Sequence, residues 1–317
     1  MTTPDPKSFL VTGATGFIGK RLLARLADVA QHVYCVVDED RGQRARLPVA
    51  SGVVPVEMGT TGQDTKAIVS RLSPDIVVNL VAQGVDPASR DSRGMISGNL
   101  GFISDLILAL RDSSPEVVLH VGSWSEYADP VDNEPIREDH PIWPTSLYGA
   151  AKATASIYGN ALARELGIPF VTLRLFNVYG PGESQGRLFP HLITNLGNLD
   201  HADLTSAEQI RDFTFVDDIV DAVLTAGTAG LEPYTAYNIC SGRPVTVHTV
   251  AERVADIMGA PRHLLRFGAI EQRHDEPPFM VGDNSRFHEA TGWRPRVTLD
   301  DGIRLTIESR AQETNTP

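Results

Sequence analysis

Short apolar runs alternate with segments of helical periodicity through the first 176 residues. The runs at 8–13, 32–37, 75–82, 116–123 and 169–176 are apolar at nearly every position, which is typical of strands buried on both faces. Between them, the apolar spacing predicts helices at 17–29, 95–112 and 146–166. The run at 52–58 contains Pro55, which cannot donate a ladder hydrogen bond, so we expect this strand away from the sheet centre. The alternation predicts an α/β fold with a doubly wound parallel sheet.

The pattern loosens after residue 176. Residues 177–187 are rich in Gly and Pro and predict a loop, 215–226 predicts a helix, and 236–242 predicts a short strand. Two more helices are expected near 246–258 and 299–309. We therefore predict a Rossmann domain of residues 1–176 with 214–241. A smaller, interleaved C-terminal α/β substrate lobe would comprise residues 177–213 with 242–312.

Composition excludes some partners. The net charge of −12 disfavours nucleic acid and anionic membranes, although a few arginines in one cleft could still hold a small anion. No apolar run approaches the ~18 residues of a membrane span, and the N-terminus is short and polar, so we predict a cytoplasmic protein. Cys35 and Cys240 lie in apolar, strand-like runs and are expected to be buried thiols. We expect no metal site.

The stretch VTGATGFIGK joins the first strand to the first helix. Gly13 permits the tight turn, Gly16 lets the backbone approach a pyrophosphate, and Gly19 lets helix and strand pack closely. The helix N-terminus offers free N–H groups and a positive dipole end. These features predict a dinucleotide site.

Asp38 ends the second strand, 19 residues past Gly19. A carboxylate there can bond both ribose hydroxyls of NAD and repels the 2′-phosphate of NADP. Arg41 and Arg44 follow closely and could instead hold that phosphate. We favour NAD(H) over NADP(H), and both remain open.

Tyr148 and Lys152 lie four residues apart in a predicted helix, in a chain with only four lysines. Residues at this spacing share one helix face. The apolar positions Leu147, Ala150, Ala151, Ala155, Tyr158 and Leu162 predict the buried face, with the pair beside it and free to face a cleft. A cation one turn away would lower the pKa of the phenol and favour acid–base work. Ser123, 25 residues before Tyr148 at a strand end, could orient a reacting carbonyl, and Ser125 follows it.

Five segments together resemble the extended short-chain dehydrogenase/reductase family. They are GATGFIG, GSWSEY, YGAAK, LRLFNVYGPG and RDFTFVDD, and the resemblance runs from about residue 8 to 310. It implies a Ser123–Tyr148–Lys152 triad and a nucleotide-diphosphate sugar as substrate. It also implies that Asn177, Arg211 and Arg273 meet the substrate phosphates, while Arg187 and Leu188 border the nucleotide.

Departures from the family pattern narrow the reaction. Dehydratases of the family carry an Asp–Glu pair after the catalytic hydroxyl residue, where this chain has Trp124 and Ser125. Members that combine epimerisation with reduction use a Cys and a His, where this chain has Ser125 and Arg187. The resemblance is greatest to 4-ketoreductases of 6-deoxyhexose nucleotides. An NAD-retaining 4-epimerase is the alternative, and a nucleotide sensor without turnover is a third class that the intact triad disfavours.

These considerations predict a complete set of site residues. Substrate contacts are expected at Ser123, Ser125, Asn177, Arg187, Leu188, Arg211 and Arg273. Cofactor contacts are expected at Gly13, Thr15, Gly16, Phe17, Ile18, Gly19, Asp38, Met58, Leu80, Val81, Ala82, Tyr148, Lys152 and Val178. The helices at 95–111 and 146–166 have apolar residues beyond one face, and in relatives such helices pair across a two-fold axis, so we expect a homodimer.

Overall fold

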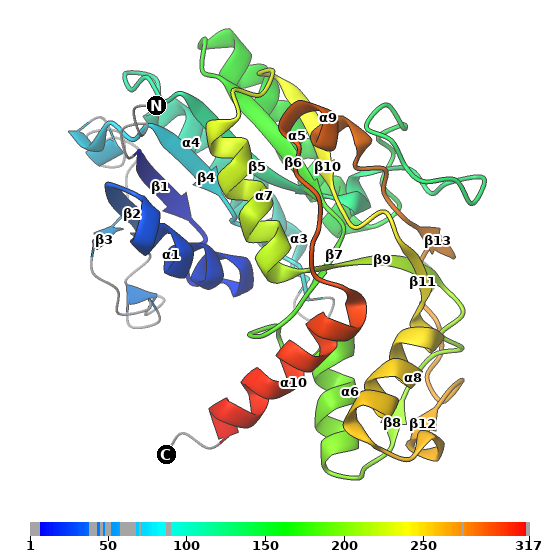
Figure 1. Cartoon of the computed structure of the whole chain (residues 1–317). Coiled ribbons are helices and arrows are strands. Elements are labelled where there is room, and N and C mark those ends of the chain that lie inside the picture. Colours follow the sequence, from blue (N-terminus) through cyan, green and yellow to red (C-terminus); the bar gives the residue numbers. More distant parts are fainter. Residues whose placement is uncertain are drawn as a thin grey trace.

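The computed structural model describes residues 7–37, 43–44, 47, 52–57, 68–69, 71–86, 90–273 and 276–314. Within these residues, seven parallel strands form the main sheet in the order β10-β6-β5-β4-β1-β2-β3 (Figure 1). The strands are β1 (Ser8–Thr12), β2 (His32–Val37), β3 (Val53–Glu57), β4 (Ile76–Asn79), β5 (Val117–Ser123), β6 (Phe170–Leu175) and β10 (Thr235–Ile239). The predicted α/β class is confirmed, and β3, which contains Pro55, is an edge strand as predicted.

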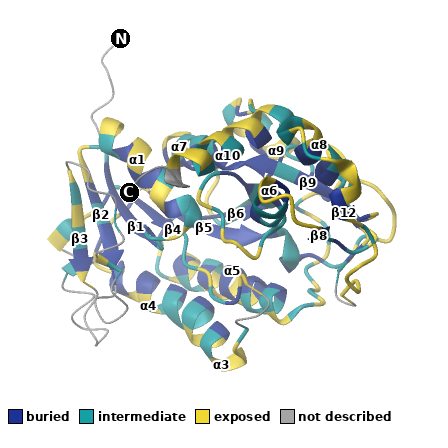
Figure 2. Cartoon of the chain, turned by 90° about the horizontal axis from the view of Figure 1, so that it is seen from below, coloured by how far each residue is buried: buried dark blue, intermediate teal, exposed yellow. Residues whose placement is uncertain are grey.

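Helices cover both faces of this sheet (Figure 2). One face packs against α1 (Phe17–Val29), α7 (Val216–Thr228) and α9 (Ser285–Thr291), whose apolar residues share a core with alternate strand positions. The other face packs against α4 (Phe102–Ala109) and α5 (Leu147–Glu165). The helix predicted at 95–112 is not regular, because α3 (Ser92–Met95) continues through a π-helical stretch, η3 (Ile96–Gly101), into α4.

The second lobe is built on a smaller sheet. Its strands are β7 (Asn177–Tyr179), β9 (Ile210–Phe215), β11 (Pro244–Thr246) and β13 (Phe279–Met280), and β9 pairs with each of the other three. Around it lie β8 (Ala202–Asp203), β12 (Leu265–Arg266), η5 (Arg262–Leu264), α6 (Leu188–Gly197), α8 (Val247–Met258) and α10 (Leu299–Thr314). The prediction that 177–187 is all loop is wrong at β7, because each residue of this short strand pairs with a residue of β9 that lies 36 positions later in the chain.

The buried face of α5 also differs from the prediction. Leu147 and Tyr158 are 64% and 48% exposed. Ala155 is buried as predicted, and the other buried positions are Gly149, Lys152, Ala153, Ser156, Gly159 and Ala163. Small residues let the helix lie close to the sheet and to α4, since a Cβ on Gly159 would be 3.1 Å from both Ile103 and Phe170. Close approach therefore favours small residues on this face, whereas Leu147, Ile157 and Tyr158 are exposed.

Both cysteines are buried and unpaired, as predicted. None of the helices in the described ranges is long and apolar enough to cross a membrane.

Candidate active site

The glycine turn lies at the point where the strand order reverses, between β1 and β4. Gly13 has φ 71°, and a Cβ on it would be 2.8 Å from the Leu80 carbonyl carbon that follows β4. A Cβ on Gly19 would overlap the Gly13 carbonyl oxygen and lie 2.7 Å from the Ala14 Cα. Gly16 is the N-cap of α1, so the first turn of that helix opens toward the crevice. This cradle fits a dinucleotide pyrophosphate.

The other predicted cofactor contacts divide into two groups. Phe17, Ile18 and Val178 are partly buried and each packs against the apolar core of the second lobe. The chain after β4 is held by Asn79, whose Oδ1 accepts hydrogen bonds from Thr12 Oγ1 at 2.6 Å and from the Val81 N–H at 3.2 Å. Leu80 and Val81 are therefore fixed against the turn, with Thr15 partly exposed in the turn itself and Ala82 exposed next to Val81. Asp38 and Met58, as well as Arg41, lie outside the described residues.

Ser123 is the last residue of β5 and caps the short helix η4 (Trp124–Glu126). Its hydroxyl oxygen accepts the Ser125 N–H at 3.2 Å and lies 2.8 Å from the Ser125 hydroxyl. It also hydrogen-bonds to Tyr148. The strand end therefore brings the two predicted hydroxyl residues to the tyrosine.

Tyr148 reaches this position because the N-terminus of α5 packs directly on η4. Ser146 caps the helix by accepting the Gly149 N–H at 3.0 Å. A Cβ on Gly149 would overlap the carbonyl oxygen of Ser125, so only glycine permits this approach. The Arg90 guanidinium lies over the Tyr148 ring, 6.0 Å from its centroid.

We expect Gly149→Ala to destabilise the protein by about 1–3 kcal/mol, the usual effect of overpacking, and to reduce activity because α5 must move away from Ser123. Urea unfolding measures the stability. Gly101→Ala is the matched control, because the nearest non-local atom to its Cβ would be 3.9 Å away. A Gly149→Ala variant as stable and active as Gly101→Ala would contradict this packing.

The protonation of the pair is set mainly by burial. The pKa of Tyr148 is raised to about 12, first by burial and then by the Glu126 carboxylate, while Arg187 and the Ser123 hydrogen bond lower it and so limit the rise. Burial lowers the pKa of Lys152 to about 8, and Glu126 opposes this change. The expected lowering of the phenol pKa is therefore not seen in this structure, because loss of solvation outweighs the nearby cations. Tyr148 carries its proton at neutral pH.

Lys152 is 1% exposed, and its Nζ donates to the Val121 carbonyl oxygen at 2.6 Å. The apolar pattern of the helix predicts Lys152 beside the buried face, whereas in the structure the residue lies within that face. The ammonium is held at the end of β5, two residues before Ser123.

The residues expected to meet phosphate lie in the second lobe. Arg211 on β9 is buried, and its Nη2 donates to Glu276 Oε1 at 2.9 Å. The positive charge of Arg273 lowers the pKa of Arg211, after the larger effect of burial, so the two guanidiniums are neighbours. Asn177 on β7 donates its amide to the Asp212 carbonyl oxygen at 3.1 Å. Arg273 is thus within electrostatic reach of Arg211, and the Glu276 carboxylate contacts Arg211 directly.

Arg187 and Leu188 begin α6 on the tyrosine side of the site. Arg187 is the N-cap of the helix, and its Nε lies 3.4 Å from Glu183 Oε1. Burial raises the pKa of Glu183 to about 7, and Arg187 opposes this rise. The electrostatic effect of Arg187 on Tyr148 places this guanidinium near that tyrosine.

Several residues of the site were missed by sequence reasoning. Arg90, Glu126 and Glu276 contact predicted site residues, yet none stands in a motif that identifies it. Glu126 lies inside the quoted GSWSEY stretch, so its position three residues after Ser123 was the one available signal.

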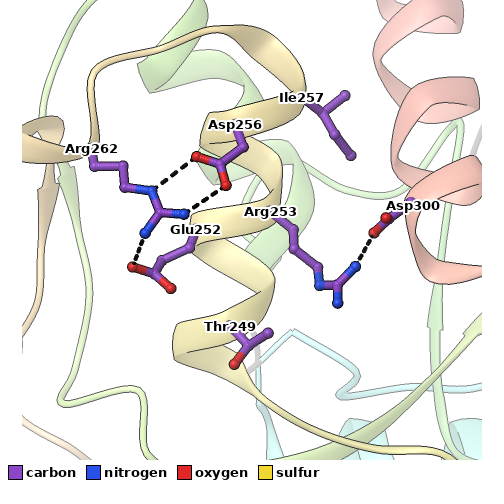
Figure 3. Close-up of a pocket in the computed structure, with 7 residues that line it drawn as sticks. All are labelled: Thr249, Glu252, Arg253, Asp256, Ile257, Arg262 and Asp300. Atoms are coloured by element: carbon purple, nitrogen blue, oxygen red, sulfur yellow. Dashed lines mark hydrogen bonds and ion pairs between the residues drawn. The ribbon is translucent and has the colours of Figure 1, made fainter.

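A charged groove between α8 and α10 is separate from these groups (Figure 3). Arg262 pairs with Asp256 and Glu252, and Arg253 pairs with Asp300. These exposed pairs connect neighbouring elements of the second lobe and have small individual effects on stability.

Three curated proteins are similar to this chain over nearly their whole length. The CDP-abequose synthase of Salmonella typhimurium is 36% identical, covering 94% of this chain and 97% of that protein. The UDP-glucose 4-epimerase of Mycolicibacterium smegmatis is 27% identical, with 94% and 97% covered. The GDP-6-deoxy-D-mannose reductase of Pseudomonas aeruginosa is 26% identical, with 96% and 98% covered. Residues 9–240 match a family model as well, and the chain belongs to the NAD dependent epimerase/dehydratase family.

Proposed function

We propose that the protein is an enzyme that reduces the 4-keto group of a 6-deoxyhexose nucleotide with NADH or NADPH. The observation that carries this proposal is that Ser123 at the end of β5 bonds to Tyr148 on α5, one turn before the buried Lys152, whose Nζ donates to Val121 on the same strand. The similarity to a GDP-6-deoxy-D-mannose reductase and to a CDP-abequose synthase supports it. Trp124 and Ser125 stand where a dehydratase needs two carboxylates, which disfavours elimination of water.

The proposed roles follow from the geometry. When bound, the nicotinamide cofactor supplies the hydride for the keto carbon. Tyr148 gives its proton to the carbonyl oxygen, which becomes the hydroxyl of the product. Ser123 orients that oxygen, and the Lys152 ammonium favours the phenolate that remains until solvent restores the proton.

We propose that the nucleotide diphosphate lies in the second lobe, against Arg211, Arg273 and Asn177. Guanidinium groups match phosphate oxygens well, and a diphosphate would replace Glu276 as the partner of Arg211. Arg187 and Leu188 at the start of α6 would border the nucleotide. We propose NAD(H) over NADP(H) because of Asp38, and parallel binding titrations of the two cofactors test this preference.

Arg211→Ala is expected to raise KM for the nucleotide sugar about 10- to 100-fold, because binding would lose one charged hydrogen-bonding group. The Kd for NAD should not change, because Arg211 lies in the other lobe from the glycine turn. Isothermal titration and steady-state kinetics measure both quantities. Arg253→Ala on α8 is the control, since Arg253 pairs with Asp300 at the surface. An unchanged KM in Arg211→Ala would refute the phosphate role.

A nucleotide-sugar 4-epimerase is the second candidate, favoured by the 27% identity to the UDP-glucose 4-epimerase. The same three residues would serve both reactions. The cofactor distinguishes them: a reductase consumes one NADH or NADPH for each product, whereas an epimerase interconverts two sugars with no added cofactor. We expect stoichiometric consumption. Turnover without consumption would favour the epimerase.

We also propose a homodimer formed through η3, α4 and α5. Large apolar side chains on these elements are exposed, namely Ile96, Leu108, Leu147, Ile157 and Tyr158. Burial of such a surface against a second copy would remove it from water.

A further inference from the structure

Glu126 is a fully buried carboxylate beside the candidate triad, with an exposed fraction of 0%. Its Oε1 accepts the backbone N–H of Ser123 at 2.8 Å and the hydroxyl of Ser156 at 3.0 Å. Its Oε2 accepts the Arg174 Nε–H at 3.0 Å. Both carboxylate oxygens are hydrogen-bonded inside the fold and the side chain is not accessible, so Glu126 acts on the site through the residues that it bonds.

These bonds join three elements that form the site. Ser123 ends β5, Ser156 lies one helical turn after Lys152 on α5, and Arg174 lies on β6. A Cβ at position 122 would be 2.5 Å from Glu126 Oε1, so Gly122 leaves room for the carboxylate. One side chain therefore fixes the strand that carries Ser123 against the helix that carries the other two residues.

Glu126 has an arginine partner on the side of β6, and Tyr148 and Lys152 on the side of α5. On the β6 side, Arg174 also donates to the Tyr127 hydroxyl at 3.0 Å, and Tyr127 donates to Asn238 Oδ1 at 2.7 Å. On the α5 side, Tyr148 and Lys152 are within its electrostatic reach.

Tyr148 and Lys152 also interact electrostatically with other charged or titratable residues. Arg90 and Arg187 act on Tyr148 against Glu126, and the neutral, buried His120 lies near Lys152.

We propose that Glu126 is a positioning residue, which holds Ser123 in register with Tyr148 and Lys152 and supplies the negative charge that faces the two α5 groups. The proposal rests on the proposed function for its kinetic consequences. Its electrostatic part concerns the folded protein alone. The charge disfavours phenolate at Tyr148 and favours ammonium at Lys152, so both groups keep their protons.

Glu126→Gln tests this without turnover. Glutamine keeps an acceptor for the Ser123 N–H and removes the charge. We expect the titration midpoint of Tyr148 to fall by about one pH unit. NMR of labelled tyrosine measures this midpoint, and the Tyr148 signal is identified by its absence from the spectrum of Tyr148→Phe. A Tyr148 titration identical to that of the wild type would overturn the electrostatic role, whether or not a nucleotide sugar is turned over.

The kinetic readouts use the same variant. We expect kcat to fall about tenfold or more with KM and cofactor Kd unchanged, and the basic limb of the pH profile to move to lower pH, because a donor must be protonated. A loss of thermal stability with an unchanged pH profile and kcat would show a merely structural residue and overturn the proposal.

Two further variants separate charge from folding. Ser156→Ala removes one bond to Glu126 and leaves the charge, so Tyr148 should titrate as in the wild type. A shift equal to that of Glu126→Gln would overturn the electrostatic role of Glu126.

If Glu126→Gln does not fold because Arg174 is left unpaired, Glu126→Gln with Arg174→Met removes the buried pair together. The Tyr148 midpoint should fall in this double variant as well, and an unshifted midpoint would refute the proposal.

Discussion

Replacing Tyr148 by phenylalanine is expected to reduce turnover about 10²- to 10⁴-fold, the range for loss of a general acid. The hydroxyl is the only group removed, and it carries a proton at neutral pH because burial raises the pKa of Tyr148 to about 12. Cofactor binding should stay near wild type, since the glycine turn, Gly13 to Gly19, is unchanged. Steady-state kinetics and a cofactor titration measure the two quantities.

Tyr158→Phe is the matched control on the same helix. Tyr158 is 48% exposed and lies ten residues after Tyr148 on α5, so this variant should keep full turnover. Wild-type turnover in Tyr148→Phe would eliminate this tyrosine as the proton donor.

Lys152→Met is expected to reduce turnover about 10²-fold or more, which is the usual effect of removing one group that stabilises the charge developing in a transition state. The same substitution is expected to make the protein more stable. The folded state lowers the pKa of Lys152 to about 8 from 10.5, so a buried ammonium destabilises the fold at neutral pH. Methionine has a similar shape and no charge. We expect Tm at pH 7 to rise by about 2–4 °C, the shift that ~1 kcal/mol produces in a domain of roughly 200 residues.

The stability advantage of Lys152→Met over the wild type should decrease as the pH rises. The unfolded chain binds more protons than the folded one between pH 8 and 10.5, so wild-type stability rises through this window relative to the variant. The advantage of Lys152→Met should be complete below pH 8 and disappear above 10.5. Lys7→Met, at a partly exposed surface pair with Glu116, should change Tm little. A Tm at pH 7 lower for Lys152→Met than for Lys7→Met would contradict the argument.

Local patterns were enough to predict much of the fold and the place of the glycine turn. The parallel sheet follows from alternating apolar strands and helices, and the turn at Gly13 to Gly19 follows from consecutive residues. Ser123 and Tyr148 are also brought together, although no spacing rule requires it. Their meeting depends on Gly149, whose contact with Ser125 is not local in sequence.

Contacts between distant segments could not be predicted. Arg174 is 48 residues from Glu126, and Glu276 is 65 residues from Arg211, so neither ion pair leaves a pattern in the chain. The prediction of the buried face of α5 was wrong for a related reason. It rested on apolar residues, whereas the close packing of small residues determines which positions of this helix are buried. Lys152 was consequently placed at the edge of a face in which it is buried.

Isotope transfer tests the central claim most directly. Cofactor carrying deuterium at the transferable position of nicotinamide C4 would be incubated with a panel of 4-keto-6-deoxyhexose nucleotides bearing CDP, UDP, GDP or dTDP. The proposal predicts one deuterium at sugar C4 in each product molecule, with one cofactor oxidised and no label transferred by Tyr148→Phe. Product formed with no label and no cofactor consumed would contradict net reduction at this carbon.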